Sequence, residues 1–254
     1  MTLLTEPTRI VLRRGWQPMD PDAAAYITAV ETADGQALEE KTKIAIDNFV
    51  LGCKADGIWP AIKASCILAG ARTLTGALIP LVGTVPTNFN FVAGDYNRKT
   101  GLVGNGSTKY LDSNRTNYDD PATNSHSSVF VSSATLGVTQ FFMGASPEIA
   151  IVVPNLTMNR LTGRVAIGPP TVNFIGSSKT NSSGFTARLN NTSTFYSASA
   201  TSPGTSNILL FAGSPGLINS NARIAFYSIG ESLDLALLDA RVTDLINAFA
   251  AAIP

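Results

Sequence analysis

Residues 99–114, KTGLVGNGSTKYLDSN, combine glycines, hydroxyls and lysines that could bind phosphate. A phosphate-binding loop places two glycines four residues apart, with a lysine and then a serine or threonine directly after the second glycine. Gly101 and Gly106 have this spacing, but two hydroxyl residues come before Lys109, and no helical pattern follows. The order is therefore wrong for phosphate binding. We expect instead a hairpin turn at residues 104–106, where positive φ angles favour glycine.

Carboxylates are scarce in the part of the chain that is richest in strand patterns. Between residues 121 and 230 the only acidic residue is Glu148. Glycoside hydrolysis in most families needs two carboxylates across a groove, so the central strands cannot supply the pair, and we expect no catalytic residues. Asp112, Asp119 and Asp120 lie before this stretch and carry the oxygen ligands that Ca²⁺ prefers, but no spaced calcium loop surrounds them. The alternative for these aspartates is a solvated turn.

The single histidine and the two cysteines indicate neither a catalytic triad nor a zinc site. His126 would be the only base for a Ser-His-Asp triad, and the G-x-S-x-G motif does not occur, so we interpret it as a surface or satisfied residue. Cys53 and Cys66 are too few for a zinc site. We expect them to be small buried side chains, and a disulfide between them stays open. The sequence therefore predicts no metal and no cofactor.

Neutral sugars are bound by aromatic faces together with amide and hydroxyl groups, which require no net charge. Several residues of the later part of the chain have this chemistry and are candidates for glycan binding: Arg188, Asn190, Asn191, Tyr196 and Tyr227. The alternative for each of them is plain protein surface.

The composition argues against nucleic-acid and membrane partners. Charged residues make up 14% of the chain, the formal net charge is zero, and no basic stripe is present. Residues 1–14 lack the apolar core of a signal peptide, and the longest apolar run, residues 73–85, is too short and too broken to span a bilayer. Residues 121–230 are instead rich in Ser, Thr, Asn and Gly. Such a surface is typical of an extracellular or particle-borne β-protein.

The first part of the chain predicts an arm followed by helices. Residues 1–21 contain Arg and Trp, residue types enriched where protein surfaces bind each other, and the candidates for docking or oligomer contacts are Arg9, Arg13, Arg14 and Trp16. The alternative is a frayed terminus. Helical patterns follow at residues 23–33, capped by Asp22, and at residues 37–53. A short third helix beginning at Pro60 would complete a small bundle.

From residue 89 onward the pattern is that of strands separated by turn-forming residues. Short segments of alternating or β-branched character predict strands at 101–103, 109–111, 128–132, 139–143, 148–153, 163–167, 171–175, 185–189, 194–197, 207–212 and 223–229. Many short strands without intervening helices predict a β-sandwich or jelly roll. The chain then closes with an amphipathic helix, for which Ser232 is a candidate cap.

These patterns predict a mainly β protein with appended helices. The expected regions are an arm at 1–21, a helical anchoring region with linker at 22–88, a jelly-roll β-sandwich at 89–230 and a C-terminal helix at 231–254 that packs back on the core. The apolar stripe of that last helix contains Leu235, Leu238, Val242, Leu245 and Phe249. A self-association seam is the alternative to packing on the core.

Three segments carry a resemblance to a known family: AIDNFVLGCKADGIWPAIKASCILAGARTLTGALIPL, NFNFVAGDYNRKTGLVGNGSTKYLDSNR and ARIAFYSIGESLDLALLDARVTDLINA. They resemble tailed-phage virion structural proteins in which helices lead into a concanavalin A-like (laminin-G-like) lectin/glucanase jelly roll, followed by a closing helix. The resemblance covers about residues 23–248, and residues 133–220 are much less similar. The acidic cluster of glucanase members has no counterpart here, and of the calcium-binding aspartates of lectin members only Asp112, Asp119 and Asp120 are plausible remnants.

The resemblance implies a non-enzymatic protein located in the virion. The first expectation is a subunit of a tail fibre, head spike or other appendage that forms a homo-oligomer, expected as a trimer. Its N-terminal part would attach to other virion proteins, and its jelly roll would bind a host-surface polysaccharide. One alternative is a capsid or tail cement or decoration protein without glycan binding. The other is a polysaccharide hydrolase, against which the missing acid pair argues.

Overall fold

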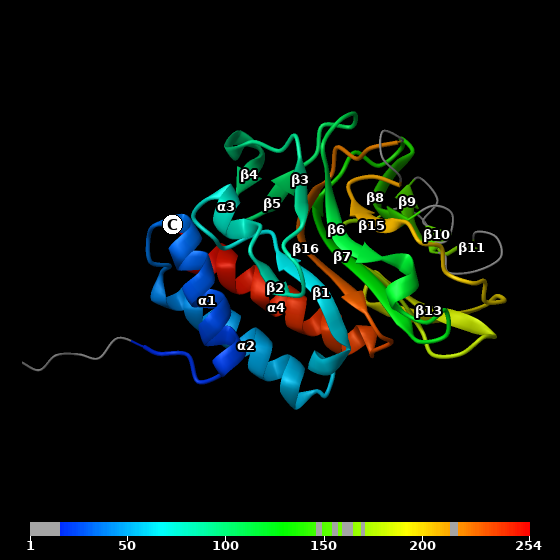
Figure 1. The fold of residues 1–254 in the computed structure, drawn as a ribbon, viewed down its shortest axis with the longest axis horizontal. Coiled ribbons are helices and arrows are strands. Elements are labelled where there is room, and N and C mark those ends of the chain that lie inside the picture. Colours follow the sequence, from blue (N-terminus) through cyan, green and yellow to red (C-terminus); the bar gives the residue numbers. More distant parts are fainter. Residues whose placement is uncertain (1–15, 146–148, 154–156, 159–164, 169–170, 214–217) are drawn as a thin grey trace, which may run out of the picture.

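The computed structural model describes residues 16–145, 149–153, 157–158, 165–168, 171–213 and 218–254 (Figure 1). The helices are α1 (Pro21–Asp34), α2 (Glu40–Ala55), α3 (Leu74–Ala77) and α4 (Leu235–Ala252), with 3-10 turns η1 (Trp59–Ala61), η2 (Ala93–Asp95) and η3 (Asn117–Asp119). The strands are β1 (Ile62–Ile67), β2 (Pro80–Val82), β3 (Thr87–Phe89), β4 (Tyr96–Asn97), β5 (Gly101–Val103), β6 (Tyr110–Thr116), β7 (Ser125–Ser133), β8 (Gln140–Ala145), β9 (Ile149–Val153), β10 (Thr157–Met158), β11 (Val165–Ala166), β12 (Asn173–Lys179), β13 (Gly184–Leu189), β14 (Thr192–Ser197), β15 (Asn207–Leu210) and β16 (Arg223–Gly230).

Two antiparallel sheets form a sandwich. The larger has nine strands in the order β14-β13-β12-β7-β16-β1-β2, with β5 beside β16 and β4 beside β5, and the smaller has the order β3-β6-β15-β8-β9. Side chains of both sheets meet in one buried apolar cluster, to which Val129 and Ile175 contribute from the larger sheet and Phe142, Ile151 and Leu210 from the smaller. The predicted fold class, mainly β with a sandwich and appended helices, is confirmed.

The helices form a third layer on the outer face of the nine-stranded sheet, away from β8 and β9 (Figure 1). The predicted apolar stripe of α4 is buried there and joins a second apolar cluster with Phe130, Phe174 and Phe226 of the sheet and Phe49 of α2. The rings of Phe49 and Phe226 pack edge to face with their centroids 5.7 Å apart. The stripe therefore packs on the core, as expected. In the described part of the chain no helix is both long and apolar enough to cross a bilayer.

Both long helices at the N-terminal side begin and end a few residues from the predicted positions. Helix α1 is capped by Asp20, whose Oδ1 accepts hydrogen bonds from the N–H groups of Asp22 and Ala23, so the prediction of Asp22 as the cap was wrong. Pro21 explains the shift, because proline suits the first helical position, where its missing N–H leaves no unmade hydrogen bond. The Asp22 carboxylate instead pairs with Lys54 of α2.

The prediction of a short third helix beginning at Pro60 is wrong. The chain makes only the single turn η1 there and then continues as strand β1. Strand β1 lies between β16 and β2, with the helical layer on one face and the second sheet on the other. Most of its side chains are therefore buried, with Lys63 partly exposed, and its sequence, IKASCI, alternates apolar and polar residues over the first five positions. The prediction gave more weight to Pro60, which suits the start of a helix, than to this short alternation.

The glycine-rich segment is a turn but not a hairpin. Gly106 has φ +71°, as expected for the turn, and Asn105 Oδ1 accepts hydrogen bonds from the N–H groups of Ser107, Thr108 and Lys109. The strands on either side do not pair with each other: β5 pairs with β16 in the larger sheet, whereas β6 pairs with β3 and β15 in the smaller. The turn therefore carries the chain from one sheet to the other.

The C-terminal helix begins after Asp234, not after Ser232. Asp234 Oδ1 accepts a hydrogen bond from the N–H of Ala236 at 2.8 Å, which satisfies one of the unpaired donors of the first turn. The Ser232 hydroxyl donates to Asn124 Oδ1 at 2.6 Å. The expectation of Ser232 as the cap was therefore wrong, and its side chain holds the loop before β7.

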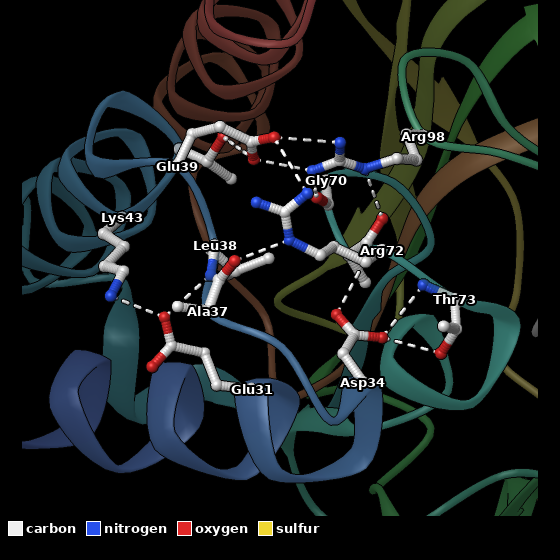
Figure 2. A network of polar contacts seen from close by, with 12 residues as sticks. Glu31, Asp34, Ala37, Leu38, Glu39, Lys43, Gly70, Arg72, Thr73 and Arg98 are labelled. Carbon is white, nitrogen blue, oxygen red and sulfur yellow. Dashed lines mark hydrogen bonds and ion pairs between the residues drawn. The ribbon is translucent and has the colours of Figure 1, made fainter.

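A network of carboxylates and arginines joins the helices to the loops beside the sandwich (Figure 2). Arg98 donates to both oxygens of Glu39, at 3.0 and 2.7 Å, and Arg72 lies 3.3 Å from the same carboxylate. Asp34 accepts hydrogen bonds from the N–H groups of Arg72 and Thr73. The hydrogen bonds from Arg98 outweigh partial burial and hold the pKa of Glu39 at about 2. The network fixes the place of α2 relative to the sheet.

The depressed pKa of Glu39 makes the stability of the fold depend on pH in acid. Because the folded pKa lies below the unfolded value of about 4.3, the stabilisation is complete above that value and is lost as the pH falls toward about 2. We expect Glu39→Gln to lower the free energy of unfolding by about 2 kcal/mol at neutral pH and to have almost no effect near pH 2. Guanidinium denaturation over this pH range measures the difference. The control is Glu40→Gln, because the exposed side chain of Glu40 makes no ion pair within the described residues; an equal effect of both variants would contradict the assignment.

Candidate functional site

Strands β12, β13 and β14 form one end of the nine-stranded sheet, and their register decides which side chains share a face. Ser178 lies opposite Thr186, and Thr186 lies opposite Phe195. Arg188 lies opposite Ser193. Because directly paired residues of neighbouring strands point to the same side, all five side chains belong to the face that the helical layer partly covers.

The N-terminal end of α4 crosses this face and leaves a groove of about 480 Å³ beside it. The groove is lined mainly by hydroxyl side chains: Ser178, Thr180, Thr186, Ser193, Ser232, Leu233, Asp234 and Leu235. Gly176 lets the helix come this close, since a Cβ there would lie 2.9 Å from Leu235 Cδ2. Leu233 N–H donates to Ser178 Oγ at 3.1 Å and ties the start of the helix to the sheet.

The hydroxyls of the groove keep hydrogen-bonding capacity for a ligand. Ser178 Oγ accepts from Leu233 N–H, and Ser193 Oγ accepts from Arg188 Nη1 at 3.3 Å, so both retain an O–H that can donate. The Thr186 hydroxyl has no hydrogen-bond partner among the residues that the structure describes. The groove therefore offers several hydroxyl hydrogen-bond donors, which the strands of the sheet hold in place.

The groove contains one carboxylate and borders one exposed aromatic ring. Asp234 is exposed, and its Oδ1 accepts the capping hydrogen bond from Ala236 N–H, which leaves Oδ2 directed at no described donor. Phe195, next to Thr186 across the sheet, is 56% exposed. Its ring packs over Gly184, where a Cβ would lie 2.4 Å from Phe195 Cζ. The absence of a side chain at Gly184 therefore lets the ring lie against the strand.

Arg188, predicted as a glycan residue, lies beside this groove but is engaged by the protein. Its Nε donates to Asp239 Oδ2 of α4 at 2.8 Å, and the Asp239 side chain is almost completely buried. Asn190 and Asn191 form the two-residue turn between β13 and β14, with φ angles of 49° and 59°. These angles are typical of a tight hairpin turn, and both asparagines are exposed at the end of the sheet.

The two tyrosines predicted to bind glycan lie on the inner side of the sandwich. Tyr227 is 0% exposed and its hydroxyl contacts the sulfur of Cys66, so the prediction that it contacts a glycan was wrong. Tyr196 stacks on Phe185 with centroids 5.7 Å apart, and its hydroxyl donates to Ile167 O at 2.9 Å. Its neighbour Phe195, which points to the other face, is the exposed aromatic that residue-type reasoning missed.

The aspartates predicted as calcium ligands are all engaged within the protein. Asp120 is 1% exposed and accepts two hydrogen bonds from Arg115, at 2.9 and 2.6 Å. Asp119 accepts from Thr116 N–H, and Asp112 accepts from Asn114 N–H and from Asn207 Nδ2. No cluster of three or more potential metal ligands occurs among the described residues. The three side chains therefore hold the end of β6 and the turn η3.

The residues predicted to dock the N-terminal arm are only partly described. Arg9, Arg13 and Arg14 lie outside the described residues. Trp16 is half-buried and packs on the apolar cluster between the helices and the sheet. The Trp16 ring thus contacts other residues of the same chain.

The histidine and the cysteines have structural surroundings. His126 is buried, with Nε2 2.8 Å from Ser228 Oγ and Nδ1 at the carbonyl oxygen of Glu231, as expected for a satisfied residue. Cys53 and Cys66 are free thiols, so the disulfide left open by the sequence does not form in this structure. Burial raises the pKa of each thiol to about 12, which keeps both protonated and unreactive.

No family model matches the chain, and no curated protein sequence matches it. Similar solved structures include a mutant of Trypanosoma rangeli sialidase displaying trans-sialidase activity (11% identity, TM-score 0.42, 79% of this chain and 39% of that chain). Domain 4 of AbnA, a GH43 extracellular arabinanase from Geobacillus stearothermophilus in complex with arabinotriose, is also similar (16% identity, TM-score 0.37, 73% of this chain and 99% of that chain). The match thus spans well under half of the sialidase chain but almost all of the arabinanase domain. At such low identity and TM-score, these likenesses assign this chain neither a family nor an activity.

Proposed function

We propose that this chain is a non-enzymatic virion subunit of a fibre, spike or appendage, which attaches through its N-terminal part and binds a host-surface glycan through its sandwich. The observation that carries the proposal is the hydroxyl-lined groove at the β12–β14 end of the sheet, with the exposed ring of Phe195 at its border. Hydroxyl donors beside an exposed aromatic face are the groups that bind uncharged polar ligands such as sugars. The resemblance of the sequence to tailed-phage virion proteins supports the location.

The chemistry of the groove favours binding over bond cleavage. Most glycosidases place two carboxyl groups on opposite sides of the scissile bond, about 5 to 9 Å apart. Asp234 is the one carboxylate among the described lining residues, and it also caps α4. The buried Asp239 nearby is paired with Arg188. A single weak site becomes effective when several copies bind one polysaccharide together, which is why we propose a homo-oligomer, a trimer, as the working form.

A cement or decoration protein without glycan binding is the second candidate. It is favoured by a groove of about 370 Å³ on the helical side, whose lining includes Tyr26, Trp59 and Leu81. Aromatic side chains of this kind are enriched in protein–protein contacts. The same groove would serve attachment to the particle in the first proposal, so the two differ in what the β12–β14 end contacts.

Imaging of an intact particle that carries this chain, combined with binding of the purified chain to host cells, tests the proposal. We expect the β12–β14 end to point away from the particle, the helical layer to face it, and the purified chain to bind cells as an oligomer. A β12–β14 end buried against capsid or tail protein, together with no binding to cells, would favour the cement protein. Release of sugar from host envelope would overturn the non-enzymatic assignment.

A further inference from the structure

We infer that the groove selects uncharged pyranose saccharides and rejects acidic ones, with Phe195 as the stacking surface and Asp234 as the group that discriminates. The inference rests on the proposed function, because it names the class of glycan bound at the same groove. It draws on three features: the charge of the lining, its hydrogen-bonding groups and the position of the aromatic ring.

The first feature is charge. The described lining residues include the carboxylate of Asp234 and no lysine or arginine. Of the cations beside the groove, Arg188 is held in an ion pair with Asp239 at 2.8 Å. Lys179, the last residue of β12, lies between two lining residues in the sequence, but it is buried and donates to the carbonyl oxygen of Gly184. The carboxylate of a uronic or sialic acid would therefore meet a like charge without a cation to compensate for it, and like charges at close range disfavour binding.

The second feature is the match of donors and acceptors. Asp234 Oδ2 is an acceptor directed at no described donor, and a carboxylate binds hydroxyl donors more strongly than a neutral acceptor does. Ser178, Thr186 and Ser193 keep O–H groups that can donate to ring and hydroxyl oxygens. A neutral sugar supplies both hydroxyl donors and oxygen acceptors, and so satisfies both kinds of group at once.

The third feature is the spacing of the ring and the hydroxyls. Phe195 and Thr186 are directly paired on adjacent strands, which places their backbones about 5 Å apart. A pyranose ring has a similar width, so one sugar can stack its apolar C–H face on Phe195 while its edge reaches the hydroxyls of the groove. The packing of Phe195 over Gly184 holds the ring against the strand and limits the ordering needed on binding.

The test is calorimetric titration of the full chain with neutral polysaccharides (dextran, mannan and galactan) and acidic ones (alginate and polysialic acid). We expect binding to at least one neutral polymer and none to the acidic polymers. Phe195→Ala should weaken that binding by about tenfold. The matched control is Tyr118→Ala, because Tyr118 is an aromatic residue 67% exposed on η3, outside the groove lining, and its removal should leave binding unchanged.

Asp234→Asn tests the discrimination separately. Asparagine caps a helix about as well as aspartate, so the variant keeps α4 in place and removes only the charge. We expect weaker binding of the neutral polymer and the appearance of binding to alginate or polysialic acid. Acidic polymers bound by the parent chain, or neutral binding unchanged in Phe195→Ala, would overturn the inference and leave adhesion standing. Binding of no polymer and of no host cells would overturn both the inference and the proposed function.

Discussion

Gly101→Ala is expected to lower the free energy of unfolding by about 4 kcal/mol or more, enough to leave little folded protein. Gly101 has φ +96°, a conformation that residues with a Cβ adopt only with strain. A Cβ there would also lie 2.2 Å from the carbonyl oxygen of Ile224 and 2.7 Å from the Cα of Ala225, both backbone atoms of the central strand β16. Neither can move without breaking the sheet. Guanidinium denaturation followed by circular dichroism measures the loss, and the soluble yield reports it if the variant does not fold.

The control for this variant is Gly35→Ala. Gly35 ends α1 with φ +64°, and no heavy atom lies within 4 Å of the position that its Cβ would take. Gly35→Ala therefore introduces backbone strain without a steric clash. We expect it to lower the free energy of unfolding by about 1 kcal/mol. Equal losses in the two variants would show that the approach of β5 to β16 is less tight than the structure indicates.

The segment around Gly101 shows what could not be predicted from the sequence. The glycines and asparagine of residues 104–108 predict a turn, and a turn is present. The sequence also favours a hairpin, because two short extended segments flank the turn. The structure instead pairs β5 with β16, which lies more than a hundred residues later in the chain. Local patterns identify a turn, whereas the partner of a strand depends on contacts between distant segments.

Strand positions could be predicted wherever one face is buried and the other is polar. Alternation in Phe185, Ala187 and Leu189 marks β13 clearly, and these three side chains point into the sandwich. Strand β1, IKASCI, also alternates apolar and polar residues over its first five positions, but Pro60 just before it favoured the start of a helix. The error thus came from giving a helix-start signal more weight than a strand pattern of only five residues.

Half of the candidate site could have been predicted from the sequence. A two-residue turn at Asn190 and Asn191 pairs Thr186 with Phe195, and the alternation of β13 places both on the outer face. The prediction chose Tyr196 by residue type, although the same register turns it inward. The other half of the groove comes from residues 232–235, at the start of α4. No local sequence pattern shows that this segment crosses β12 and β13.

Arg115→Ala is expected to lower the free energy of unfolding by about 3 to 5 kcal/mol, because it removes the arginine partner of a carboxylate that water barely reaches. Asp120, 1% exposed, accepts two hydrogen bonds from the guanidinium of Arg115. Replacing both partners with apolar residues, in Arg115→Met with Asp120→Leu, should recover much of the loss. Lys63→Ala is the control, since its ion pair with Glu231 is solvent-exposed and should matter little. A double variant less stable than Arg115→Ala would show that Asp120 acts mainly through other groups, which would reopen a role for it as a ligand.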